Sequence, residues 1–150
     1  MAFPTSGWLR QSLIVAMTAP VAASTFDWNA APKCALWTNA FAGTAAYDTD
    51  TKYGTAPWNA QEVAAGGGYS TGGITMGATT CTISPAGTIM FDAPDTDWTT
   101  ATITARGSLS YDSQAGSLYA LCAHNFGADF TSGGGTFRIQ WNVLGLFTVA

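Results

Sequence analysis

Residues 98–111 read WTTATITARGSLSY, and this stretch decides the fold class. Small or apolar residues take every second position from Ala101 to Tyr111, and threonine, serine or arginine takes the positions between them. Side chains alternate between the two faces of a β-strand, so a period of two indicates a strand. We therefore expect one long strand, with one face on a core and the other facing solvent or a partner.

Six further segments have the length and the apolar or alternating pattern of strands: residues 33–39, 74–82, 87–92, 117–126, 137–141 and 144–149. Turn residues at 112–116 predict that the long strand pairs with 117–126 in an antiparallel hairpin. The glycine-rich segment 127–135 has the composition of another turn region. We predict a mainly β protein, an antiparallel, jelly-roll-like β-sandwich with a short N-terminal helix.

The start of the chain has the pattern of a short amphipathic helix over about residues 6–17. Ser6 can cap it, and Leu9 and Leu13 share one face. The same stretch imitates a secretory signal peptide, but Pro20 interrupts the apolar run, which is too short to span a membrane. We expect a retained helix or arm over residues 1–25.

This arm precedes a single β-sandwich domain over residues 26–150, because no linker or internal repeat divides the chain. Phe3, Trp8 and Leu9 lie at or beside the apolar face of the expected helix. Large apolar side chains in such a place anchor a segment to a neighbouring protein. We predict these three as the partner-binding residues.

The composition is poor in charge. Hydrophobic residues make up 47% of the chain and charged residues only 9%, against about a quarter in an ordinary soluble domain. A protein that stays free in solution usually keeps a charged surface. We expect much of this surface to be covered by copies of the chain or by other proteins. A net charge of −4 argues against binding to nucleic acid, which needs a basic surface.

The three cysteines, Cys34, Cys81 and Cys122, have no CxxC spacing. Each lies in an apolar or strand-like run, which favours buried free thiols. A bridge from Cys81 to either of the others stays open at this point.

Two stretches imitate ligand sites. The glycine run 66–73 lacks the lysine and the following helix of a phosphate loop, so we interpret it as a loop that needs positive φ beside Tyr69. Asp92, Asp95 and Asp97 could offer oxygen ligands to a hard cation, but their spacing misses the EF-hand pattern, and aspartates are common in turns. We predict no metal and no cofactor, and whether these carboxylates bind an ion stays open.

His124 is the only histidine, and it lies near Cys122. A thiol and an imidazole can act as nucleophile and base. No third member or oxyanion donor is evident, and the chain has no GxSxG or HExxH motif. We predict no catalytic residues, no small-molecule substrate and no enzymatic activity.

Tryptophans are frequent and could either stack on sugars or fill a core and a protein interface. The low charge favours core and interface. The six are Trp8, Trp28, Trp37, Trp58, Trp98 and Trp141.

The order of segments resembles a group of small structural proteins of tailed bacteriophages. The quoted segments are WLRQSLIVAM, KCALWTNAF, NAQEVAAGGGYSTGG, MFDAPDTDWTTATITARGSLSYD, LYALCAHNFGAD and GGGTFRIQWNVLGLFTV. Pro20 and Pro94 depart from the group's pattern without disturbing this order. The most specific positions are Glu62, Gly68, Tyr69, Gly72, Gly73, Asp97, Trp98, Thr104, Arg106, Phe126 and Gly127.

The resemblance implies a virion component, assembled in the host cytoplasm, and no functional residues are carried over from the group. We expect a capsid decoration or cement protein that binds and stabilises the head lattice. Its expected partners are the major capsid protein and copies of itself in a homo-oligomer, without a membrane. The alternative is a tail, baseplate or head-fibre component, including a glycan-binding adhesin.

Overall fold

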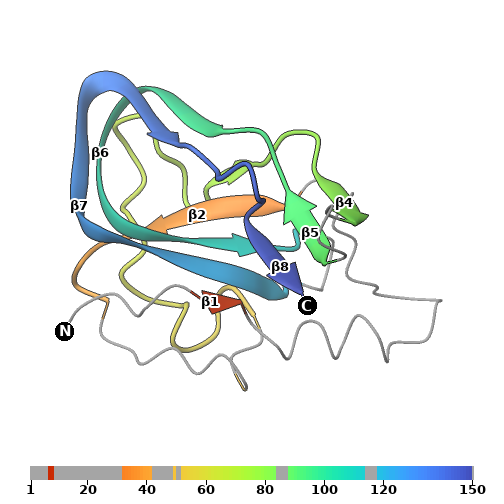
Figure 1. Cartoon of the computed structure of the whole chain (residues 1–150). Helices are drawn as coiled ribbons and strands as arrows, with labels where there is room; N and C mark the ends of the chain where they lie inside the picture. Colours follow the sequence, from red (N-terminus) through yellow and green to blue (C-terminus); the bar gives the residue numbers. More distant parts are fainter. Residues whose placement is uncertain are drawn as a thin grey trace.

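The computed structural model describes residues 7–8, 32–41, 49, 52–83, 88–113 and 118–149. Among these residues every regular element is a strand, so the protein is mainly β. Figure 1 shows the arrangement. The strands are β1 (Gly7–Trp8), β2 (Lys33–Trp37), β3 (Ile74–Thr75), β4 (Thr80–Ile83), β5 (Ile89–Asp92), β6 (Thr96–Tyr111), β7 (Ala120–Ile139) and β8 (Phe147–Val149).

These strands form two antiparallel sheets. The main sheet has the order β1-β7-β6-β2-β3, and the small sheet has the order β4-β5-β8. Tyr111 pairs with Ala120 at one end of the long hairpin and Thr96 with Ile139 at the other, which confirms the predicted pairing of β6 with the strand that follows it. The predicted segment 74–82 is divided between β3 and β4.

The alternation predicted for β6 is correct only up to its middle. Ile103 and Ala105 are buried, and Thr102 and Thr104 are exposed. The register then shifts between Ala105 and Gly107, and all residues from 107 to 111 are buried. The expectation that the serines of this stretch face outward is therefore wrong, because beyond the bulge both faces of the sheet are covered.

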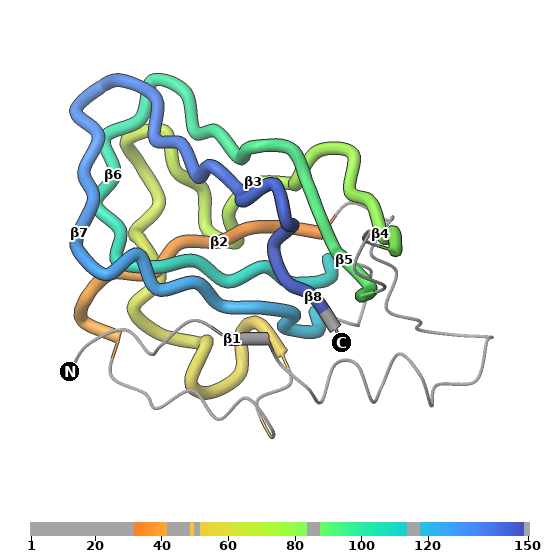
Figure 2. The backbone as a smooth tube through the Cα atoms, in the orientation of Figure 1, coloured from red at the N-terminus to blue at the C-terminus, as the bar shows by residue number. Residues whose placement is uncertain are grey.

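The predicted turn at 127–135 is also wrong, because β7 runs through it for 20 residues. Its glycines bend the strand instead of ending it: Gly127 and Gly134 have positive φ values of 80° and 81°. Gly133 and Gly135 still pair with Thr102 and Ala101. The β6–β7 pair consequently curls, as the tube in Figure 2 shows.

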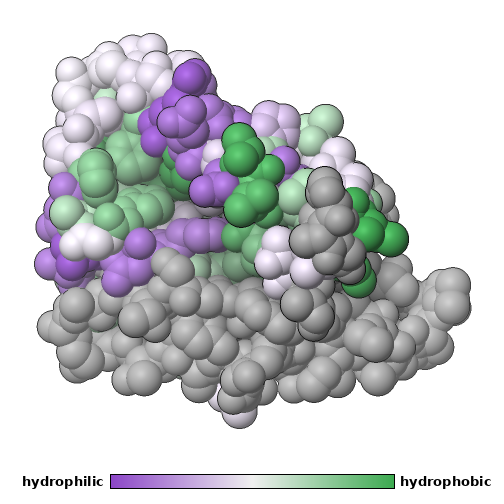
Figure 3. Space-filling model, in the orientation of Figure 1, coloured by the Kyte–Doolittle hydropathy of each residue, from purple (hydrophilic) through white to green (hydrophobic). Residues whose placement is uncertain are grey.

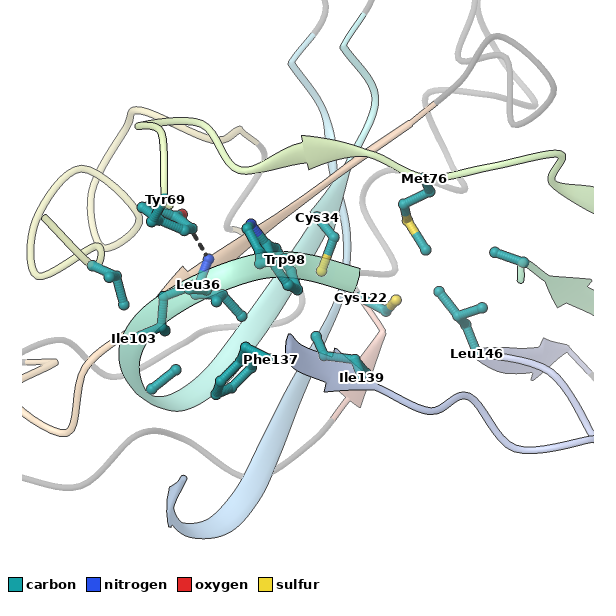
Figure 4. Packing of buried hydrophobic residues seen from close by; sticks show 14 of the residues in the cluster. Cys34, Leu36, Tyr69, Met76, Trp98, Ile103, Cys122, Phe137, Ile139 and Leu146 are labelled. Atoms are coloured by element: carbon teal, nitrogen blue, oxygen red, sulfur yellow. Dashed lines mark hydrogen bonds between the residues drawn. The ribbon is translucent and has the colours of Figure 1, made fainter. Parts of the chain in front are cut away.

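Buried side chains form a core on each face of the main sheet. The main core contains Cys34, Leu36, Trp98 and Phe137 from the main sheet (Figure 4). It also includes Phe91 from the small sheet. The second core lies on the other face and contains Ala35, Trp37, Phe41, Trp58, Leu109, Tyr111, Ala120 and Ala123.

Segment 52–63 helps to build the second core. The rings of Trp37 and Trp58 meet edge to face at 5.5 Å, and those of Tyr53 and Tyr111 stack at 4.4 Å. Val63 N–H donates to the Leu36 carbonyl over 2.9 Å, so the backbone of this segment is also tied to β2.

Gly7 and Trp8 form the short strand β1, paired with Ala123 and Cys122 of β7. The expected helix over residues 6–17 is therefore wrong at these two positions, where the backbone is extended and completes the ladder of β7. Phe3, Leu9 and the rest of the expected helix lie outside the described residues.

The C-terminal strand follows a tight turn. Gly145 N–H donates to the Asn142 carbonyl over 2.8 Å, and β8 then pairs with β5. Within the described ranges, no helix is long and apolar enough to cross a membrane.

Candidate functional site

An open hollow of about 500 Å³ lies along the outer half of β7. Phe130 is 54% exposed there, and its ring lies edge to face with that of Phe126 at 6.2 Å. Figure 3 shows apolar atoms in this hollowed region of the surface. The lining residues are Phe126, Phe130, Thr131, Ser132, Thr136, Phe137, Arg138, Ile139 and Gln140.

The bulge in β7 produces this hollow. Four residues, 126–129, stand opposite Arg106 alone, because Gly107 pairs with Asn125 and Ala105 with Phe130. The Asn125 side chain accepts the N–H of Gly127 over 2.8 Å. Extra residues on one strand of a pair bend that strand and redirect its side chains. Phe130, which pairs with Ala105 at the end of the bulge, is half-exposed at the hollow.

A buried serine holds the two strands together below the hollow. Ser132 Oγ donates to the Ala101 carbonyl over 2.8 Å and accepts the N–H of Ile103 over 3.3 Å. Ser132 is only 8% exposed, so these bonds satisfy backbone groups that water does not reach.

A second surface feature is the turn before β8, which exposes two aliphatic side chains. Val143 is 90% and Leu144 68% exposed. The Asn142 side chain accepts the N–H of Leu144 over 2.9 Å, and Gly145 has a φ of 87°. A Cβ at Gly145 would lie 2.6 Å from the Phe91 carbonyl oxygen, so the turn is held closely against β5.

The edge of the small sheet is also open. All four residues of β4 are exposed, and Ile83, 77% exposed, pairs with Ile89, 45% exposed. Exposed aliphatic side chains grouped in this way mark surfaces that contact other molecules.

The three aspartates each have a separate partner. Asp97 forms a two-point ion pair with Arg138, at 2.7 and 2.5 Å. Asp95 accepts the N–H of Trp141 over 3.2 Å, and Asp92 accepts the N–H of Ala93 over 2.9 Å. The hydrogen bonds from Arg138 lower the pKa of Asp97. In the described part of the chain, no group of acidic, histidine or cysteine side chains has the geometry of a metal site.

Glu62, which was not predicted as a site residue, organises the glycine loop with its carboxylate. Glu62 Oε1 accepts the O–H of Tyr69 over 2.7 Å and the N–H of Gly72 over 2.6 Å, and Oε2 accepts the O–H of Tyr53 over 2.8 Å. The Tyr69 oxygen in turn accepts the N–H of Leu36 over 2.9 Å. Burial, followed by the nearby Glu62, raises the pKa of both tyrosines. One signal in the sequence could have found this cluster: Glu62, Tyr69 and Gly72 are among the most specific positions of the resemblance to phage structural proteins.

The glycine run has the structural role that was predicted. Gly66, Gly67, Gly68, Gly72 and Gly73 all have positive φ. Gly73 lies so close to β2 that a Cβ would be 1.8 Å from the Cys34 carbonyl oxygen. Only glycine permits both the backbone conformation and the approach.

The cysteines are all free, and Cys34 and Cys122 are buried as predicted. Cys81 is exposed on the edge strand β4, so the prediction is wrong for it, and no bridge joins it to the other two. Burial raises the pKa of the Cys34 thiol to about 12 and that of Cys122 as well. A thiol with a raised pKa is protonated at neutral pH and is a poor nucleophile.

His124 contacts the chain that precedes β8. Its Nε2 lies 3.1 Å from the Leu146 carbonyl oxygen, and its ring centroid lies 5.1 Å from that of Trp141. Burial lowers the pKa of His124.

Three of the tryptophans, Trp37, Trp58 and Trp98, are at most 2% exposed and belong to the cores. Trp141 is partly buried, and its indole N–H donates to Thr96 Oγ1 over 3.0 Å. These four tryptophans support the interpretation as core over that as a sugar-stacking platform. Trp28 lies outside the described residues, as do the predicted anchors Phe3 and Leu9.

Comparison with known proteins finds no matching family model, no similar curated protein and no similar solved structure. The candidate site is therefore defined by geometry alone: the hollow on β7, the Val143–Leu144 turn and the open edge of β4.

Proposed function

We propose that the protein is a structural component of a tailed-phage particle, a decoration or cement protein that binds and stabilises the head lattice. The observation that carries this proposal is the hydrogen-bonded turn before β8, in which Val143 is 90% and Leu144 68% exposed. A preformed apolar projection loses little conformational entropy when it is covered, so it suits a contact between proteins. The low proportion of charged residues, 9%, supports the same conclusion.

In this proposal the partners are the major capsid protein and further copies of the chain. Many small contacts, repeated by the symmetry of the shell, together give strong attachment. The two antiparallel sheets, which share a core, form a jelly-roll-like sandwich that displays the turn and the β4 edge. Phe3, Trp8 and Leu9 of the N-terminal arm serve as a further anchor to a neighbour.

The first test is the copy number per particle, measured by quantitative mass spectrometry of purified virions against the major capsid protein. A decoration protein is expected at roughly one copy per capsid subunit, or one per three. A small multiple of three or six copies per particle would contradict the head assignment and place the protein in the tail.

The contact itself is tested by binding to particles from which the protein has been removed. We expect the double variant Val143→Ser, Leu144→Ser to bind at least about tenfold more weakly. Ala64→Ser, at an exposed position just before the glycine run 66–73, is the control and should bind as the unchanged chain does. Equal binding by the double variant would contradict the assigned contact.

The hollow on β7 favours a second candidate, a tail, baseplate or head-fibre component that binds a glycan as an adhesin. Phe126 and Phe130 could pack on the apolar face of a sugar, and Thr131 and Gln140 could bind its hydroxyls. A glycan array followed by Phe130→Ala tests this candidate. Loss of a glycan signal in the variant would favour it over the head assignment.

A further inference from the structure

His124 connects the main sheet to the segment that ends in β8. Its Nε2 is 3.1 Å from the Leu146 carbonyl oxygen. A carbonyl oxygen only accepts hydrogen bonds, so the contact requires the proton on Nε2. Leu146 N–H in turn donates to the Phe91 carbonyl of β5 over 2.8 Å. The imidazole is therefore one link in a chain of contacts from β7 through Leu146 to the small sheet.

The other ring nitrogen, Nδ1, has no hydrogen-bond acceptor for a second N–H. Nδ1 of His124 is buried and has no hydrogen-bond partner. With Nε2 already donating, protonation would add a second N–H and a positive charge in a site closed by Trp141, whose ring centroid is 5.1 Å away. A buried donor without an acceptor and a buried unpaired charge are both costly.

The described groups around the ring offer little to offset that charge. Residues 141–149 contain no ionisable side chain. The thiols of Cys122 on β7 and Cys34 on β2 are held neutral by burial, and β6 contributes Ser108 opposite the imidazole. Lys33, the first residue of β2, has the same charge as a protonated imidazole and cannot offset it. The other charged groups on these elements have partners of their own: Arg106 with Asp129, Asp97 with Arg138, Asp95 with Trp141 N–H and Asp92 with Ala93 N–H.

We propose that His124 is a pH-sensitive clasp, which in its neutral form holds the segment 141–149 on the main sheet and on protonation releases it from β5 and β7. Burial lowers the pKa of His124, in the direction that this geometry requires. A neutral His124 therefore stabilises the closed segment fully above the unfolded imidazole pKa of about 6.5, and this stabilisation declines as the pH falls below that value toward the lower folded pKa.

The test is amide hydrogen exchange of the β8 segment, corrected for the intrinsic pH dependence of exchange. In the unchanged chain, the protection of the Leu146 and Phe147 amides should fall about tenfold per pH unit between pH 6.5 and the folded pKa. In His124→Gln, whose side-chain N–H can still donate to the Leu146 carbonyl but does not titrate, the protection should be flat over this range. A flat profile in the unchanged chain, or an equal loss in both proteins, would overturn the proposal.

A second measurement does not depend on a variant that folds. His124 is the only histidine, so the imidazole signals in an NMR titration belong to it alone. We expect a titration midpoint below 6.5, with the Leu146 amide shift following the same curve. A midpoint at the ordinary value, or an amide shift that does not follow it, would also overturn the proposal.

Discussion

The two halves of the β6–β7 pair are made by the same two strands but differ in burial. Near the hairpin end, every residue of β6 from 107 to 111 is buried, and β7 is buried from Ala120 to Ala123. In the other half, buried residues such as Ile103 alternate with exposed ones, and Phe130 is 54% exposed. The bulge between the halves is the boundary.

The difference arises from what covers each half. The hairpin half lies between the main core and the second core, with Trp58 and Phe41 closing the second face. The open half has only the main core on one face, where the hollow also lies, and its other face meets solvent. A strand that is buried on both faces tolerates few substitutions, because its side chains are closely packed, whereas an exposed face is able to contact a partner.

The largest effect is expected where the glycine loop meets the covered half. In Gly73→Ala, the Cβ would be 1.8 Å from the Cys34 carbonyl oxygen, and φ is already 68°. Because the obstacle is backbone, β2 must move, and we expect a loss of at least about 3 kcal/mol in the free energy of unfolding. Denaturant unfolding followed by tryptophan fluorescence measures it.

Gly54→Ala is the matched control for this change. Gly54 has a φ of 81°, but nothing lies within 4 Å of an added Cβ. It should cost only about 1–2 kcal/mol, the penalty for positive φ alone. Equal losses in the two variants would mean that the close approach of the loop to β2 is not what constrains Gly73.

Two phenylalanines, one buried in the second core and one exposed at the hollow, should respond differently to truncation. Phe41 is fully buried in the second core, so Phe41→Ala should lower the free energy of unfolding by about 3–5 kcal/mol. Phe130 lies half exposed in the hollow, so Phe130→Ala should cost less than about 1 kcal/mol. Thermal unfolding of both variants checks the contrast, and a large loss in Phe130→Ala would show that the hollow is part of the core.

The smallest effect is expected at the ion pair on the open half. Arg138 lowers the pKa of Asp97, so the pair stabilises the fold above the unfolded carboxyl pKa of about 3.9. This contribution is lost as the pH falls through the lower folded pKa. Asp97→Asn should therefore lower the unfolding temperature slightly at neutral pH and low salt, and the difference should shrink in acid or in high salt. A difference that is independent of both would contradict an electrostatic origin.

The local pattern was sufficient for single strands and insufficient at the bulges. Residues 98–111 and 33–39 were recognisable as strands from their alternating residue types, although β2 is buried on both faces. The register shift at Arg106 could not be read from that alternation, because it depends on the four residues of β7 that stand opposite. The run of glycines near Gly134 suggested a turn, because glycines occur both in turns and in bulges within a strand. Only the pairing with β6 shows that β7 bends here and does not end.

The candidate site was less predictable than the strands. The aspartates near Asp95 are close in sequence, but their partners Trp141 and Arg138 come from the far end of β7 and beyond. The role of Glu62 depends on the hydroxyls of Tyr53 and Tyr69, which only the folded loop brings to one carboxylate. Tertiary contacts of this kind have no fixed spacing along a chain.

The sequence alone determined the mainly β class, the pairing of the long hairpin, the conformation of the glycine loop and the burial of Cys34 and Cys122. These follow from local alternation, turn residues and the unique freedom of glycine at positive φ. Only the tertiary structure decided that β7 continues through its glycines, that one half of the hairpin is covered on both faces, and that His124 meets Leu146. Those outcomes depend on which segments, distant in the sequence, pack on each face of the main sheet, and this packing involves the whole chain.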